Sequence, residues 1–237
     1  MLYQLKDQSA HMWAESDDLA GLILELRKLS QASQLEYAIH SEEKLIISSA
    51  MFAIEKFLPA TELILRFHKD QVRKGDGHPY LEHPLGVATV LWQAGVDSES
   101  IVAAVCHDLL EDTECTAEQI ESACGKQVLS IVEALTNDST LSDKTDWEEK
   151  KVKYIASVGS FGKEAIVVSV ADKICNLRSF LAQYKVEGKK IWRKFNRGRL
   201  KNIWFAELEL GLAKKVVNKQ MYNDLAFLIK ELKMTEE

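Results

Sequence analysis

The sequence predicts an all-α fold, and three features of the 237-residue chain support this prediction. Glycine and proline are scarce, with 11 Gly and 3 Pro, which favours long helices over a turn-rich β fold. Apolar residues recur three and four positions apart, the spacing of one helix face, in most segments. We find no internal repeat and no convincing pair of strands.

The N-terminal region, residues 1–50, is predicted to consist of accessory helices. One helix is expected to begin near Leu19, after the capping residues at 16–18. Its inward apolar stripe is formed by Leu19, Leu22, Ile23 and Leu26. A second helix is expected over 41–57, although its capping box is incomplete.

The following segment is predicted to be helical on both sides of a polar loop. One helix opens near Pro59, in the first turn that proline tolerates, and ends at about Val72. After the loop over 73–82, a second helix begins at Pro84 and ends near Gly95.

Capping residues separate the helices that come next. Asp97 or Ser98 caps one helix, and Thr116 with Gln119 forms a capping box for another. Gly125 separates this helix from the one that follows it.

The C-terminal half is predicted to hold several more helices after a polar loop over 137–145. A charged helix is expected over 147–158, and one or two amphipathic helices over 199–233. The segment 166–181 begins with a β-branched run that is also typical of a strand. We predict a helix there because the apolar pattern continues to its end with no turn signal.

Composition and charge narrow the function classes. The net charge is −6, from 30 basic and 36 acidic residues, which argues against a bulk nucleic-acid binder. The four cysteines form no C-x-x-C pair, the N-terminus is too polar for a signal peptide, and no apolar run approaches the ~20 residues of a membrane span. We therefore expect a cytoplasmic protein with no nucleic-acid or membrane partner, and leave a homo-oligomer open.

The segment HDLLED at residues 107–112 is the most informative motif. It places His107, Asp108, Glu111 and Asp112 directly after an apolar run. On a helix, residues three and four apart share a face, so this pattern predicts one dense polar patch. Buried carboxylates are normally paired or bind a metal, and a divalent cation would hold such a patch together.

Two other segments present ligand-type side chains, namely His83 at a helix start and Asp172 in mid-helix, with His107 and Asp108 also expected in mid-helix. Considered alone, such a histidine is more often a core residue than a metal ligand, and such a carboxylate is more often paired with a basic residue. Two imidazoles and two carboxylates together favour Mn, Fe, Co or Zn over an all-oxygen Mg site. Such an ion lowers the pKa of bound water.

Four segments together resemble the HD phosphohydrolase superfamily, and more closely the RelA/SpoT-type hydrolase domain and the stand-alone (p)ppGpp (alarmone) hydrolases. They are RKGDGHPYLEHPLGVA (73–88), AAVCHDLLEDT (103–113), CGKQVLSIVEALTND (124–138) and VADKICNLRSF (170–180). The resemblance covers about residues 60–182 and implies an HD-domain helical bundle over 51–190. The C-terminal helices over 191–237 are expected to pack on it.

The resemblance also implies residue roles. The metal ligands, usually of manganese, would be His83, His107, Asp108 and Asp172. Glu111 and Asp112 match the pair that activates water and handles protons. Arg73 and Lys74 match the basic pair near the nucleotide.

Two more positions follow from the resemblance: Asn176 and Ser179 match residues that contact the nucleotide sugar and base. His68 matches a structural position. We interpret Lys144, Lys150 and Lys151 as solvated rather than phosphate-binding.

The function that the resemblance implies is hydrolysis of the 3′-pyrophosphate of a guanine nucleotide, ppGpp or pppGpp, to GDP or GTP and pyrophosphate. The expected cofactor is Mn²⁺ or another divalent transition metal. Two alternatives stay open. One is a phosphohydrolase acting on another 2′- or 3′-phosphorylated nucleotide such as NADPH, and the other is a nucleotide-sensing module without catalysis.

Overall fold

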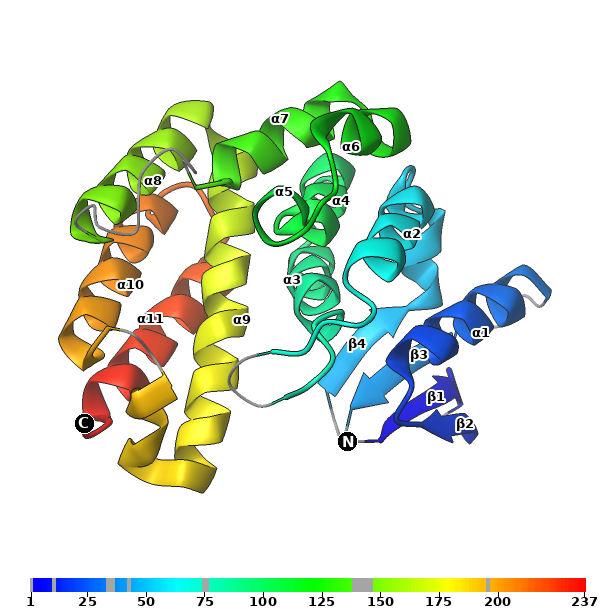
Figure 1. Ribbon diagram of the computed structural model, residues 1–237, viewed down its shortest axis with the longest axis horizontal. Coiled ribbons are helices and arrows are strands. Elements are labelled where there is room, and N and C mark those ends of the chain that lie inside the picture. Colours follow the sequence, from blue (N-terminus) through cyan, green and yellow to red (C-terminus); the bar gives the residue numbers. More distant parts are fainter. Residues whose placement is uncertain are drawn as a thin grey trace.

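The computed structural model describes residues 2–9, 12–32, 37–41, 44–73, 77–137, 147–194 and 197–237. A helical bundle built around the long helix α9 (Lys163–Glu187) lies beside a small N-terminal sheet (Figure 1). The helical fold class is confirmed. None of the helices in the described ranges combines the length and apolar character that a membrane crossing needs.

The N-terminal sheet has four antiparallel strands in the order β2-β1-β3-β4. They are β1 (Tyr3–Asp7), β2 (Met12–Ser16), β3 (Tyr37–Ser41) and β4 (Lys44–Ser48). The helix α1 (Leu19–Ala32) packs against the sheet with its predicted apolar stripe buried. Asp18 caps this helix by accepting the Gly21 N–H at 2.9 Å.

The sheet corrects two expectations. The absence of a strand pair was wrong, and so was the helix over 41–57, which contains β4 and a 3₁₀ helix, η1 (Ser49–Ala53), before α2 begins. Each strand has only five residues, and so short an apolar alternation cannot be distinguished from helical spacing.

The other helices follow the predicted order. They are α2 (Phe57–Phe67), α3 (Glu82–Gln93), α4 (Ser98–Cys106), α5 (Leu109–Asp112), α6 (Ala117–Cys124), α7 (Lys126–Leu135), α8 (Trp147–Phe161), α10 (Arg199–Ala213) and α11 (Lys219–Met234), with a 3₁₀ helix, η2 (Gly188–Lys194), after α9. The Asp97 cap and the capping box of Thr116 and Gln119 are both present. The predicted loop over 137–145 lies outside the described residues, except for Asn137.

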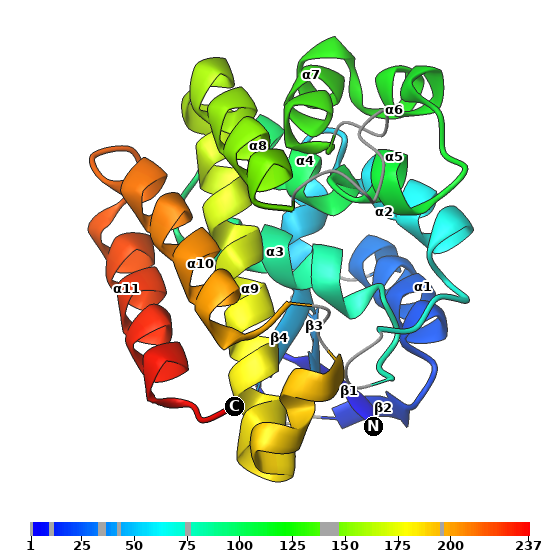
Figure 2. The ribbon, with the colours of Figure 1, turned by 60° about the vertical axis from the view of Figure 1, so that its left-hand side comes forward.

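Helix α9 is the axis of the bundle, and its helical state confirms the prediction over 166–181. Helices α3 and α4 pack on one side of it, and α8, α10 and α11 on the other (Figures 1 and 2). Because neighbours surround its N-terminal half, that half is apolar almost all round. The division of the chain at residues 50 and 190 stays a prediction.

The helix through the HDLLED motif is broken, which corrects the expected mid-helix position. Helix α4 ends at Cys106, His107 is its C-cap residue, and Asp108 precedes α5. The His107 Nδ1–H donates to the Ala104 carbonyl at 2.8 Å. In an unbroken helix that carbonyl would accept the Asp108 N–H, so the imidazole takes the place of a backbone donor.

Candidate active site

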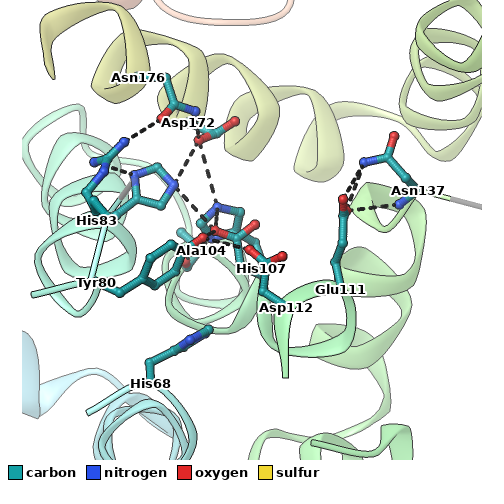
Figure 3. Close-up of polar contacts among 12 residues, drawn as sticks. His68, Tyr80, His83, Ala104, His107, Glu111, Asp112, Asn137, Asp172 and Asn176 are labelled. Carbon is teal, nitrogen blue, oxygen red and sulfur yellow. Dashed lines mark hydrogen bonds and ion pairs between the residues drawn. The ribbon is translucent and has the colours of Figure 1, made fainter. Parts of the chain in front are cut away.

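Four ligand-type side chains from three parts of the chain meet at α9. Figure 3 shows three of them, His83, His107 and Asp172, pointing toward one another. His83 lies in the first turn of α3, His107 and Asp108 at the α4–α5 junction, and Asp172 in α9. His83 Nε2 lies 3.4 Å from Asp108 Oδ2 and 3.1 Å from Asp172 Oδ1. His107 Nε2 lies 3.1 Å and 3.8 Å from the same two oxygens. The fold thus brings together the four residues that the sequence predicts as ligands.

This donor set fits a divalent cation. Ligand atoms about 2.1 Å from an ion lie roughly 3.0 to 3.5 Å from one another, close to the observed spacing. The ligand atoms of His83, His107 and Asp108 all lie within 4.8 Å of one another. His107 Nε2 is buried and has no hydrogen-bond partner among the described residues. Since Nδ1 is occupied by the hydrogen bond to Ala104, Nε2 is the ring nitrogen that faces the cluster and would bind a cation.

Electrostatics favour a positive charge where these side chains meet. Burial lowers the pKa of His107, but Asp108 and then Asp172 outweigh it and raise this pKa to about 9. Burial raises the pKa of Asp108, yet the His107 and His83 imidazoles hold it well below its usual value. Against the same effect of burial, His83 lowers the pKa of Asp172. Both carboxylates are therefore ionised, the form that binds a cation.

Polar residues connect the ligands to the loop before α3. Arg73 Nη2 donates to Asn176 Oδ1 at 2.9 Å, and Asn176 Nδ2 donates to Asp172 Oδ1 at 2.6 Å. Arg73 Nη1 also lies 3.3 Å from His83 Nδ1. Two predicted nucleotide-binding residues are thus in contact with two predicted ligands.

A cavity of about 670 Å³ opens at this point. The predicted site residues that line it are Arg73, Asp112, Asn176 and Ser179. Tyr80 and Lys173, which the sequence did not single out, line it as well. Lys74 lies outside the described residues, so its predicted place beside the nucleotide stays a prediction.

Tyr80 is the main site residue that the sequence reasoning missed. Its hydroxyl lies 2.6 Å from Asp108 Oδ2 and 3.0 Å from Asp112 Oδ2 and donates to these carboxylates. Burial, and then Asp108, raise the pKa of Tyr80 far above its usual value, so the hydroxyl stays protonated. The only signal in the sequence was its place three residues before His83.

Glu111 and Asp112 face different neighbours, although the motif predicts one patch. Asp112 faces Tyr80, whereas Glu111 accepts from the Asn137 Nδ2–H at 2.8 Å and from its backbone N–H at 3.3 Å (Figure 3). The motif predicts that His107 and Glu111 share a face because it assumes a continuous helix. The helix is broken at the α4–α5 junction, so this prediction does not apply there.

Two side chains near the site have other surroundings. His68 is fully buried, its Nδ1 lies 2.8 Å from Gln71 Oε1, and Gln71 donates to the Asp112 carbonyl at 3.1 Å. These contacts suit the structural position that the sequence resemblance implies for His68. Lys151, expected to be solvated, is partly buried, because its ammonium lies over aromatic rings.

Comparison with known proteins finds sequence similarity over most of the helical bundle. A family model described as "HD domain" matches residues 60–203. The human guanosine-3′,5′-bis(diphosphate) 3′-pyrophosphohydrolase MESH1 is 34% identical over 183 residues, which cover 76% of this chain and 96% of the human protein. The Aquifex aeolicus guanosine-3′,5′-bis(diphosphate) 3′-pyrophosphohydrolase is 31% identical over 156 residues, which cover 66% of this chain but only 22% of that protein.

Among solved structures, a metazoan ortholog of SpoT that hydrolyzes ppGpp has a TM-score of 0.61 with this chain. The match covers 75% of this chain and 95% of the other, at 24% sequence identity. At that identity the likeness shows a common fold.

Proposed function

The chain belongs to the HD-domain family, and on that premise we propose that it is a metal-dependent pyrophosphohydrolase of guanosine tetraphosphate and pentaphosphate. It would remove the 3′-pyrophosphate of ppGpp or pppGpp and leave GDP or GTP. The observation that carries this proposal is the convergence of two imidazoles and two carboxylates next to a cavity, where Tyr80 and Asn176, which line the cavity, contact Asp108 and Asp172. The substrates named for its human and Aquifex relatives support the choice of nucleotide.

The residues that would hold the metal are His83, His107, Asp108 and Asp172. Their mixed nitrogen and oxygen donors suit Mn²⁺, which we propose as the ion, although Fe, Co and Zn accept the same set. When bound, the ion supplies Lewis acidity and lowers the pKa of water.

The chain's own residues would bind the nucleotide and move protons. Arg73 places a guanidinium at the cavity, where it neutralises phosphate charge. Asn176 and Ser179 line the same wall and would contact the ribose and base. Asp112, whose carboxylate is oriented by Tyr80, would accept the proton of the attacking water, and Glu111 would assist it.

The reaction balances without a redox partner. The oxygen of water bonds to the phosphorus attached to the ribose 3′ oxygen, and the bond between that phosphorus and the 3′ oxygen breaks. One water proton goes to Asp112, which passes it to the 3′ oxygen as that oxygen becomes the hydroxyl. The products are GDP or GTP and pyrophosphate.

The direct test is incubation of the purified protein with ppGpp and Mn²⁺, followed by measurement of GDP and pyrophosphate. We expect stoichiometric release of both, and loss of release in Asp172→Asn and after chelation of the metal. NADPH in a parallel reaction tests the other substrate class, since it would release inorganic phosphate. Correctly folded, metal-loaded protein that leaves ppGpp intact would contradict the proposal.

The setting of the enzyme is also proposed. Cys106, Cys115 and Cys124 are free thiols, which suits the reducing cytoplasm. The expected partner is the guanine nucleotide alone, without nucleic acid, and a homo-oligomer stays open.

A further inference from the structure

A buried ion pair connects α9 to α10 behind the proposed ligands. Lys173 follows Asp172 on α9, and its ammonium lies 3.3 Å from Glu209 Oε2 on α10. The Glu209 side chain is 1% exposed and that of Lys173 is 15% exposed. Within the described ranges, Glu209 is the one carboxylate that forms an ion pair with this ammonium. A carboxylate buried so deeply depends on its cation.

Glu209 is held from a second side as well. The Ser169 hydroxyl donates to Glu209 Oε1 at 3.2 Å, and the Tyr154 hydroxyl donates to Ser169 Oγ at 3.1 Å. Ser169 precedes Lys173 by one helical turn, so both side chains face α10. Helices α8, α9 and α10, which lie side by side in Figure 2, thus share one polar network.

The ring of Phe205 supports the lysine ammonium groups. Lys173 Nζ lies 4.2 Å from the ring centroid, and Lys151 Nζ lies 4.7 Å from it. These distances are within the range of cation–π attraction. Two ammonium groups thus share one buried carboxylate, Glu209, behind Asp172.

Lys173 also lines the 670 Å³ cavity, together with Arg73 and Asn176. An ammonium has three donor protons, and the ion pair with Glu209 uses one direction only. A phosphate group in the cavity is the ligand that matches its remaining donors and its charge.

We propose that Glu209 is a positioning residue that holds the Lys173 ammonium at the cavity wall, where this ammonium contacts phosphate oxygens of the bound nucleotide. The inference rests on the proposed function and adds a helix beyond the HD motifs, α10, to the site. It separates two tasks: Lys173 touches the substrate, and Glu209 acts only through Lys173.

The test is a double-mutant cycle on ppGpp binding to metal-free protein, measured by calorimetry. Lys173→Met removes one charge-assisted contact and is expected to weaken binding about tenfold to a hundredfold. Glu209→Gln leaves the lysine present but unanchored, and about threefold to tenfold weakening is expected. Because Glu209 acts through Lys173, the double variant should bind like Lys173→Met alone.

Kinetics on the metal-loaded protein provide a second readout. Both variants should raise the KM for ppGpp by about the factor seen in binding, with the larger part of the effect in KM rather than kcat. Lys153→Met is the matched control, because Lys153 is an exposed lysine paired with Glu149 on α8. It removes one positive charge and should leave both measurements unchanged.

The outcomes separate this inference from the proposed function. If the wild type hydrolyses ppGpp but Lys173→Met binds it as tightly, only the inference is overturned. If the losses of binding add in the double variant, Glu209 has only a structural role. The same conclusion follows if Glu209→Gln lowers the melting temperature and weakens binding equally in the wild type and in Lys173→Met. If the wild type binds ppGpp without hydrolysing it, the proposed function fails, while the cycle still decides the inference. If the metal-free wild type does not bind ppGpp but the metal-loaded protein hydrolyses it, the KM values decide the inference. A metal-loaded wild type that neither binds nor hydrolyses ppGpp overturns both.

Discussion

The hydroxyl of Tyr80 contacts two carboxylates with different proposed roles. Asp108 is a proposed ligand, Asp112 a proposed proton acceptor, and both lie within hydrogen-bond distance of the same oxygen. Motif reasoning found the two carboxylates because acidic residues near an HD pair are distinctive. It missed Tyr80, because a tyrosine in a loop has no characteristic spacing from either of them.

Replacement of Tyr80 tests the contact of its hydroxyl with Asp108 and Asp112. Tyr80→Phe should lower kcat about tenfold to a hundredfold, since hydrogen bonds to charged groups contribute about 1.5–3 kcal/mol each. Bound metal, measured by mass spectrometry, should stay near the wild-type ratio because the four ligands remain. Tyr222→Phe, in α11, is the control and should leave kcat unchanged. An unchanged kcat in Tyr80→Phe would remove the tyrosine from the mechanism.

At the scale of secondary-structure elements, two glycines differ in backbone conformation. Gly125 joins α6 to α7 with φ at 91°, a value that residues with a Cβ atom rarely adopt. Gly211 lies inside α10, where nothing stands within 4 Å of the place that a Cβ atom would occupy. The sequence predicts the first as a separator between helices, and only the backbone shows why it must be glycine.

Alanine at these two positions should change stability in opposite directions. Gly125→Ala should lower the free energy of unfolding by about 1 kcal/mol or more, because alanine strains the positive φ. Gly211→Ala should raise it by about 0.5–1 kcal/mol, because helical alanine loses less conformational entropy. Urea denaturation of both variants checks this, and the same sign for both would contradict it.

The contact between α9 and α10 predicts a pH dependence of stability. Burial raises the pKa of Glu209 to about 7 despite the attraction of Lys173. The folded chain therefore keeps a proton that the unfolded chain loses above about pH 4.5, so this group makes the folded state less stable as pH rises from about 4.5 to 7. Its destabilising contribution is complete above pH 7 and absent below 4.5.

Glu209→Gln removes this titration. Relative to the wild type, the variant should gain on the order of 2 kcal/mol between pH 5 and pH 8. Thermal unfolding of the two proteins at both pH values measures the gain, with Glu207→Gln, whose carboxylate is half exposed, as the control. A constant difference between variant and wild type would show that Glu209 does not titrate in this range.

Over the whole molecule, the sheet and the bundle share one hydrophobic core. The cluster of buried side chains includes Leu5 in β1 and continues through α3 and α9. The Thr89 hydroxyl in α3 donates to the Ile46 carbonyl in β4 at 2.8 Å, and the Tyr3 hydroxyl lies 3.4 Å from Glu82, the residue before His83. The sheet therefore supports the helix that carries a proposed ligand.

Loss of core volume in the sheet should destabilise the whole chain. Leu5→Ala should cost about 2–4 kcal/mol, because Leu5 is fully buried, and the protein should still unfold in a single transition. At 25 °C its kcat should match the wild type, since the cavity residues are unchanged. Leu2→Ala, at a side chain that is 55% exposed, is the control. Two separate transitions in calorimetry would show that the sheet folds independently.

The sequence alone determined the helical class, most helix starts and the identity of the four metal-ligand candidates. Capping boxes, proline starts and long apolar periods are local signals, and the HD motif is distinctive. Tertiary structure alone decided three features: the small sheet, the break at the α4–α5 junction, and the contacts that place Tyr80 at the cavity and Glu209 beside Lys173. The sheet and the contacts of Tyr80 and Glu209 join residues far apart in the chain, and the free energy of such contacts has no counterpart in local spacing. The break depends on the hydrogen bond from the His107 imidazole to the Ala104 carbonyl, which helical periodicity does not reveal.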